Sequence, residues 1–348
     1  MKRYIDSLKY LWILLAMPLA ASTVRIYAVS PAGGGIFVID PATNQVVQKI
    51  EDIETPHAID FSPDGSRGYV GDGANQTLDV VDTKTGKVIK RVPVSGVPHL
   101  TAAVSDGKRV VVCINHPVGA VDIVDANSLE KVKTILTKGN KHDCYTTKDG
   151  KYAIAGSSAS PGFISGIDLQ TEQIAWEIPF DRSILTMAIE SNPDGSARRI
   201  FVQLGKFDGF AVVDFATHRE VARIELPKVG LRSDTSGIIV NGVSHGAGVT
   251  PDGNTYWIND LAYNAVFVYS LPDLKLIGHV DMPELKLPGH PPLTGDPHWI
   301  TFTPDSKTAY IPNLNVRSVV AIDVKTLKVV ANIPVGEGRT HDSTLVIP

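Results

Sequence analysis

The sequence predicts an all-β fold, a seven-bladed β-propeller whose blades are four-stranded sheets arranged around an axis. Three observations predict it. A pattern recurs along the chain with spacings of 42 to 58 residues, and a period of this size is typical of propellers and other repeat folds. Each copy holds short segments in which apolar and β-branched residues alternate with polar ones between turn residues, as strands require. The two ends of the chain together supply one further copy.

One complete copy, residues 56–97, shows the four strands of a blade. The first strand is HAIDF (57–61), which ends at the turn PDG, and the second is RGYVG (67–71). The third is TLDVVD (77–82), and the turn TKTGK leads into the fourth, VIKRVPV (88–94). Gly, Asp and Asn occupy the turns because they tolerate left-handed backbone or bond to it with their side chains.

The same elements recur in the other copies. Related turns stand at 105–107, 148–150, 193–195, 251–253 and 304–306. The third strand recurs as GIFVID, AVDIVD, SGIDL, GFAVVD, AVFVYS and VVAID. The repeated aspartates of these strands are expected to cap the turns that follow rather than to act in catalysis. They are Asp40, Asp82, Asp125, Asp168, Asp214 and Asp323.

The chain ends predict how the ring closes. Residues 25–50 supply strands two to four of a blade without a first strand, and THDSTLVIP (340–348) supplies a first strand alone. Pairing them makes one blade from both termini and leaves no exposed sheet edge. The prediction is a single domain over 23–348, whose first strands begin near residues 57, 99, 142, 187, 245, 298 and 341.

Residues 1–22 are expected to be a secretory signal peptide. Lys2, Arg3 and Lys9 form a basic region, residues 10–19 are apolar, and 20–22 offer small residues for cleavage. The apolar run is short for a transmembrane helix, so an uncleaved anchor is the minor alternative. We therefore expect a periplasmic or secreted protein without a membrane span after cleavage.

Charge and cysteine content exclude some functions. The formal charge is −4 for the whole chain and becomes more negative without the basic leader, which argues against a nucleic-acid partner held by general electrostatics. Cys113 and Cys144 are the two cysteines, with neither CxxC nor CxxCH, so covalent c-type haem is excluded. The pair forms either a disulfide between the second and third blades or buried thiols; the sequence leaves both open.

Histidine recurs at one fixed place, seven residues before the aspartate of a turn or at the aligned chain end. The six are His57, His99, His142, His245, His298 and His341, and Met187 occupies the slot in the seventh copy. The slot lies near the start of the innermost strand, so these residues are expected to surround the axis at one mouth of the channel. Imidazole is the commonest metal ligand and thioether sulfur suits copper. Two other interpretations are a structural ring between blades and a metal-free catalytic ring.

The repeat resembles the YVTN-repeat β-propellers of bacteria and archaea over the whole mature chain. The matching segments are the P-x-x-I/V first strands, second strands such as GYVGDG, YWIND and YIPNLN, and tails such as TKTGKVIKRVPVSG; no copy spells YVTN. The histidine ring is similar to the copper-binding propellers of nitrous oxide reductase and thiocyanate dehydrogenase. That resemblance implies that the six histidines are copper ligands. The chain has neither a cupredoxin domain nor a paired-cysteine copper site, which excludes nitrous oxide reductase itself.

Polar residues are expected beside the ring. Lys206, Glu337 and Arg339 are the candidates for orienting substrate or moving protons, and Asp143 is placed to orient His142. Two long insertions, 229–243 and 284–296, would add loops to the same face, where binding loops often occur. Any single one of these charges would otherwise belong to a solvated rim.

Three functions follow from these features. The first is a copper protein with oxidoreductase activity on a small molecule at the channel mouth, with zinc, iron or calcium as alternative metals. The second is a non-enzymatic propeller whose rim binds a partner protein or another ligand. The third is a metal-dependent lactonase or hydrolase, which an imidazole ring fits poorly because such sites are rich in oxygen ligands.

Overall fold

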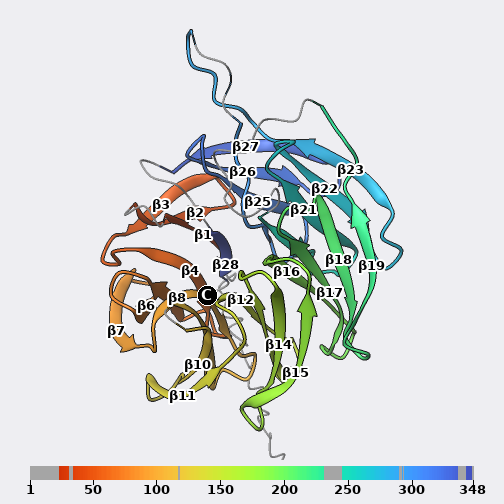
Figure 1. Cartoon of the computed structure of the whole chain (residues 1–348). Helices are drawn as coiled ribbons and strands as arrows, with labels where there is room; N and C mark the ends of the chain where they lie inside the picture. Colours follow the sequence, from red (N-terminus) through yellow and green to blue (C-terminus); the bar gives the residue numbers. More distant parts are fainter. Residues whose placement is uncertain are drawn as a thin grey trace, which may run out of the picture.

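The computed structural model describes residues 23–30, 34–116, 118–230, 245–289, 292, 294–335 and 342–346. Within them every regular element is a β-strand, and the strands form seven four-stranded antiparallel sheets. Figure 1 shows the sheets set around a central axis like the blades of a propeller. The predicted fold class and blade number are confirmed.

Each blade contributes one strand to each of four concentric positions. The innermost strands are β4 (Pro56–Phe61), β8 (Val97–Ala103), β12 (Lys141–Thr146), β16 (Ile184–Ser191), β20 (Ala247–Val249), β24 (Thr301–Phe302) and β28 (Asp342–Val346). The second strands are β5 (Arg67–Asp72), β9 (Arg109–His116), β13 (Tyr152–Ser157), β17 (Ala197–Leu204), β21 (Thr255–Asp260), β25 (Thr308–Asn313) and β1 (Arg25–Ser30). The third strands are β6 (Thr77–Asp82), β10 (Ala120–Asp125), β14 (Gly162–Asp168), β18 (Gly209–Asp214), β22 (Ala265–Ser270), β26 (Ser318–Asp323) and β2 (Gly35–Asp40). The outermost strands are β7 (Lys87–Pro93), β11 (Glu130–Leu136), β15 (Gln173–Phe180), β19 (Arg219–Glu225), β23 (Leu276–Asp281), β27 (Lys328–Pro334) and β3 (Gln45–Ile50). We number the blades from blade 1 (β4–β7) to blade 7, which closes the ring.

Blade 7 is built from both ends of the chain, in the strand order β28-β1-β2-β3. The C-terminal strand β28 pairs antiparallel with β1, with Ile26 opposite Leu345 and Ala28 opposite Ser343. Closing the ring in this way removes the unpaired edge that the N-terminal three strands would expose. The predicted closure is confirmed.

The hydrophobic core lies between the blades. The middle strands read as nearly continuous buried runs, for example BBBBB in GIFVI of β2 and in TLDVV of β6, because both of their faces meet a neighbouring blade. The described residues form seven buried clusters, and each joins adjacent blades around the ring. The outer strands are mostly exposed instead, as in EKVKTIL of β11, in which Ile135 is the one buried residue. Inter-blade packing therefore fixes where each inner strand begins at the axis.

The repeated aspartates of the third strands cap turns, as predicted. Asp82 accepts the Thr85 amide at 2.7 Å, and Asp168 accepts the Thr171 amide at 2.8 Å. The other four make the same kind of bond to amides two or three residues later. These carboxylates are therefore engaged in turn geometry.

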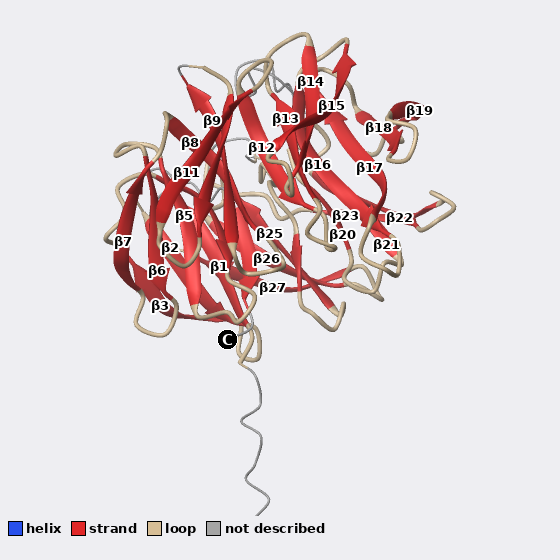
Figure 2. Ribbon diagram, turned by 90° about the horizontal axis from the view of Figure 1, so that it is seen from below, coloured by secondary structure: helices blue, strands red, loops and turns tan. Residues whose placement is uncertain are grey.

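Hydrogen bonds define the two faces of the disc. The start of each inner strand bonds to the loop between strands two and three, as in Gly73 N to Thr55 O (3.1 Å) and Gly205 N to Ser183 O (2.8 Å). The PDG-type turns lie on the other face, where Asp149 N bonds to Gly195 O of the next blade at 3.0 Å. In the view turned by 90°, the strands run between these two faces (Figure 2). The histidine slots therefore belong to the face of the strand-two to strand-three loops, which we call the ring face.

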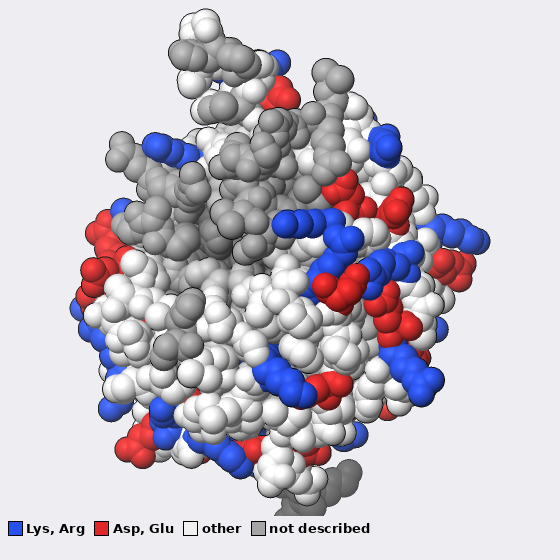
Figure 3. Space-filling view, in the orientation of Figure 1, with Lys and Arg blue, Asp and Glu red and all other residues white. Residues whose placement is uncertain are grey.

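The surface carries charges of both signs. In the view along the axis, the visible Lys, Arg, Asp and Glu side chains lie mostly around the rim, without a field of one sign (Figure 3). No helix long and apolar enough to cross a membrane occurs in the described ranges.

Candidate metal centre

In three blades a β-bulge directs the histidine side chain toward the axis. In blades 1, 2 and 3 the pairing of the inner strand with its neighbour slips where the histidine stands: between Pro56 and Ile59, between Pro98 and Thr101, and between Lys141 and Asp143. A bulge places an extra residue outside the regular ladder and redirects its side chain. His57, His99 and His142 are therefore not part of the alternation that buries their neighbours between blades.

In blades 5 and 6 backbone hydrogen bonds hold the histidines instead. The amide of His245 donates to Asn259 Oδ1 at 2.9 Å, and the amide of His298 donates to the carbonyl of Pro312 at 3.0 Å. Gly246 allows the two blades to approach, because a Cβ there would lie 2.8 Å from the carbonyl carbon of His298. The second strand of each blade thus fixes the position of the histidine.

These five histidines converge around the axis. The ring centroids of His57 and His99 are 3.5 Å apart, those of His99 and His142 are 3.8 Å apart, and those of His142 and His245 are 5.2 Å apart. His245 and His298 follow at 4.8 Å. Five blades each contribute one imidazole to a single cluster, which we call the histidine ring.

Trp299 lies directly below the histidine ring, in contact with its imidazoles. Its indole is 4.6 Å from the imidazole centroid of His245, 5.8 Å from that of His298 and 6.3 Å from that of His142, against which it stacks at 14°. It is 8% exposed and belongs to the cluster of Ala58 and Leu100, one layer below the ring. Beyond it lies a channel cavity of about 310 Å³. Trp299 therefore separates the ring from this channel, a role that the sequence analysis missed.

Met187 is not part of the histidine ring. The expectation that it surrounds the axis together with the histidines was wrong. In blade 4 the register slips earlier, between Ile184 and Met187, so that Met187 pairs in the regular ladder with Val202. Its side chain is fully buried in the cluster between blades 3 and 4, beside Ile154 and Ile164. The bulge of blade 4 begins two residues before Met187. The side chain of Met187 therefore points into the interface between the blades and not toward the axis.

Carboxylates support two of the imidazoles. Asp143 is fully buried, and its Oδ1 lies 2.5 Å from Nδ1 of His142 while its Oδ2 accepts the Tyr145 hydroxyl at 3.0 Å. Nδ1 of His298 lies 3.2 Å from the carbonyl oxygen of Asp296 and 3.8 Å from its carboxylate. A carboxylate at Nδ1 fixes the tautomer and leaves Nε2 available to a metal. The predicted orienting role of Asp143 agrees with this geometry, and Tyr145 is a further partner.

The donor set fits a transition metal. Ligand atoms of His99, His142 and Asp143 lie within 4.8 Å of one another, and the other three described imidazoles adjoin them. Imidazole nitrogen suits copper, zinc, iron and nickel, whereas calcium requires six to eight oxygen ligands. Calcium is therefore the poorest fit among the four metals that we considered.

His57 is a weak base in the ring. Burial, together with the nearby imidazoles of His142 and His298, lowers the pKa of His57 from 6.5 to about 3. A neutral imidazole is the form that binds metal. The crowding of the ring thus keeps a metal-binding form of His57 at acidic pH.

The metal-free protein is expected to lose stability in acid because of His57. Its folded pKa is about 3, below the ordinary value of 6.5, so the unfolded chain binds the extra proton as the pH falls. The stabilising contribution is complete above pH 6.5 and is lost progressively between pH 6.5 and 3. Urea unfolding at several pH values checks this. His57→Gln should flatten the profile over that range, and His279→Gln, at an exposed outer-strand histidine, should leave it unchanged.

The hydroxyl of Tyr145 is expected to support metal binding. Tyr145→Phe removes the donor to Asp143, and loss of such outer partners typically lowers metal affinity by about 10–100-fold. Competition with a chromophoric chelator measures the change. Tyr310→Phe, which removes a hydroxyl bonded at 3.0 Å to Asn44 near the junction of blades 6 and 7, is the matched control. Equal copper affinity in the two variants would contradict a supporting role.

The remaining predicted site residues are not all placed. His341, Glu337 and Arg339 lie outside the described residues. Lys206 is exposed in the loop between β17 and β18 on the ring face, where its carbonyl accepts a bond from Arg182 at 2.6 Å. The catalytic roles of these residues stay predictions.

Cys113 and Cys144 are both free and buried in the structure, in neighbouring blades. Burial raises the pKa of Cys113 well above its ordinary value, and a hydrogen bond with Cys144 raises it further. The sequence analysis did not anticipate the group beside them. The side chain of Lys141 is fully buried and donates to Ser165 Oγ at 2.9 Å. Burial lowers the pKa of this amine to about 8.

The fold and the site together define a β-propeller with a cluster of imidazoles on its axis. A chain of Kuenenia stuttgartiensis hydrazine synthase has a similar structure, with a TM-score of 0.69 and 20% identity over 85% of this chain and 96% of that one. The dihydro-heme d1 dehydrogenase NirN, in complex with DHE, gives a TM-score of 0.62 and 15% identity over 95% of this chain and 77% of that one. At these identities the similarity shows the fold.

Sequence comparisons add no family. No protein-family model matches the chain, and no curated protein is similar to it in sequence. The resemblance to the YVTN-repeat propellers therefore stays a prediction from the repeat.

Proposed function

We propose that this chain is a periplasmic or secreted copper-binding β-propeller that carries out redox chemistry on a small molecule at its ring face. The observation that carries the proposal is the convergence of five imidazoles from five separate blades, with neighbouring centroids 3.5 to 5.2 Å apart. One of the similar structures is named a dehydrogenase, which supports redox chemistry on this fold.

Each group of residues at the site would have a separate role. His57, His99, His142, His245 and His298 would hold the metal, with His341 as a sixth ligand in blade 7. Copper would supply one-electron redox chemistry. Asp143 keeps the tautomer of His142, and Trp299 blocks the axis from the opposite face. Substrate and water would therefore reach the ring from the ring face alone, where Lys206, Glu337 and Arg339 would orient substrate or move protons.

Elemental analysis of the mature protein tests the proposal. The protein is purified without chelator from a copper-replete periplasm, and one or more equivalents of copper per chain are expected. Reduction with ascorbate and reoxidation in air, followed by the Cu(II) electron paramagnetic resonance signal, then shows whether the metal cycles. Stoichiometric zinc would redirect the search to hydrolysis, and a folded protein without metal would make the ring a packing device of a binding propeller.

A further inference from the structure

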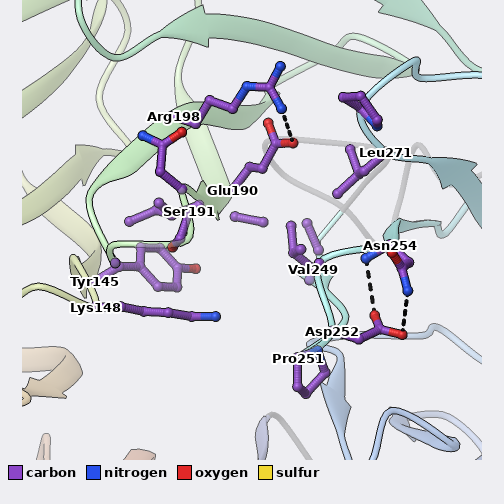
Figure 4. Close-up of a pocket in the computed structure, with 18 of the residues that line it drawn as sticks. Tyr145, Lys148, Glu190, Ser191, Arg198, Val249, Pro251, Asp252, Asn254 and Leu271 are labelled. Atoms are coloured by element: carbon purple, nitrogen blue, oxygen red, sulfur yellow. Dashed lines mark hydrogen bonds and ion pairs between the residues drawn. The ribbon is translucent and has the colours of Figure 1, made fainter.

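A groove opens between blades 4 and 5, on the face opposite the histidine ring. The inner strand of blade 5, β20, has three residues, and all three are half-buried. The facing strand of blade 4, β16, has eight residues and is buried over its first five. Between them lies a groove of about 760 Å³, which is within the range of small-molecule sites. Figure 4 shows its lining.

The walls of this groove combine an apolar part with polar and charged side chains. Val249 and Ile300 line its inner part, and Pro251 and Leu271 line the side of blade 5. In Figure 4 the ring of Tyr145 lies across the groove from Val249 and Pro251. A space bounded by aliphatic side chains on one wall and an aromatic ring on the other fits a flat apolar body, which contacts both walls at once.

One charge in the groove is left for a ligand. Glu190 is paired with Arg198 at 3.4 Å and with Arg199, and both oxygens of Asp252 accept bonds from Asn254, at 3.1 and 2.8 Å. The amine of Lys148 makes no ion pair with a carboxylate of the described residues. Figure 4 shows its side chain extending below Tyr145 toward the middle of the groove.

We propose that the groove between blades 4 and 5 is a second binding site, for a small molecule with a flat apolar body and one anionic group that pairs with Lys148. The site is distinct from the histidine ring and opens on the other face. It adjoins the ring through one residue: Tyr145 lines the groove and donates to Asp143, which bonds to His142. A ligand in the groove therefore contacts Tyr145, whose hydroxyl supports His142 through Asp143.

Two fluorescent probes test the proposal, because they share an aromatic body and differ in charge. They are 8-anilinonaphthalene-1-sulfonate, which carries the anionic group, and N-phenyl-1-naphthylamine, which lacks it. The wild-type protein is expected to bind the sulfonate at one site per chain and about ten-fold more tightly than the neutral probe, a difference of about 1.4 kcal/mol that the ion pair with Lys148 supplies. Lys148→Gln should remove this preference and leave the neutral probe unaffected.

Variants of the groove and of another turn supply the controls. Val249→Trp fills the groove and should abolish binding of both probes, with a thermal melt to show that the variant folds. Lys307→Gln changes the exposed lysine of the corresponding turn of blade 6, which pairs with Asp305 at 3.1 Å, and should bind both probes as the wild type does. Equal affinity of the two probes for the wild type, or an unchanged preference in Lys148→Gln, would overturn the proposal.

Discussion

Replacing His57 and His245 together by alanine is expected to abolish stoichiometric copper binding. The two histidines stand on blades 1 and 5, on either side of the cluster, so the double variant removes a donor from each part of the ring. Of the three described imidazoles that remain, His99 and His142 still adjoin each other at 3.8 Å, whereas His298 loses its neighbour His245, so that two adjacent imidazoles are left in place of five. The expected loss exceeds the roughly 10–100-fold effect of an outer partner. Equilibrium dialysis followed by elemental analysis measures it.

The control for this result removes two histidines elsewhere. His218 lies in a surface turn against Trp176, at 4.5 Å between centroids, and His279 is on the outer strand of blade 5. His218→Ala/His279→Ala should retain the copper content of the wild type. If the ring variant and the control held equal copper, the metal would lie outside the ring; if the wild type held none, the imidazoles would serve packing alone.

The fold could be predicted because the repeat carries its own redundancy. Turn glycines, capping aspartates such as Asp82 and Asp168, and buried third strands recur in nearly every copy, so an error in one blade is corrected by the others. The predicted first strands began within three residues of the observed ones, for example at Pro56 for 57 and at Thr301 for 298. Inter-blade packing imposes one geometry on all copies. The sequence repeat was therefore sufficient to predict the fold.

The site could be predicted only in part, because the direction of a side chain depends on the local register. His142 and Met187 hold the same position relative to their turns, but the bulge falls at His142 in blade 3 and before Met187 in blade 4. Nothing in the two sequences marks that difference. The roles of Tyr145, in β12, and of Trp299, just before β24, were missed for the same reason: each is one apolar residue among many until the fold places it beside an imidazole.

The second large effect is expected from Trp299. It is 8% exposed, contacts four of the ring imidazoles and closes the channel below them. Trp299→Ala should lower the free energy of unfolding by about 3–5 kcal/mol, the usual cost of deleting a buried aromatic side chain. Its void would join the 310 Å³ cavity on the far side, so that solvent enters the ring from both faces.

Urea unfolding of the metal-free protein measures this cost, and Trp176→Ala is the matched control because that indole is half-buried in the outer strand β15. The control should lose much less stability. A measurement of copper binding separates two possible functions of Trp299, holding the imidazoles in place and closing the channel. The bulges and the bonds to Asn259 and Pro312 hold the imidazoles through the backbone, so Trp299→Ala should still bind copper, with faster reoxidation by dissolved oxygen once the plug is gone. A variant that is destabilised and also loses copper would show that the indole itself holds the ring open for the metal.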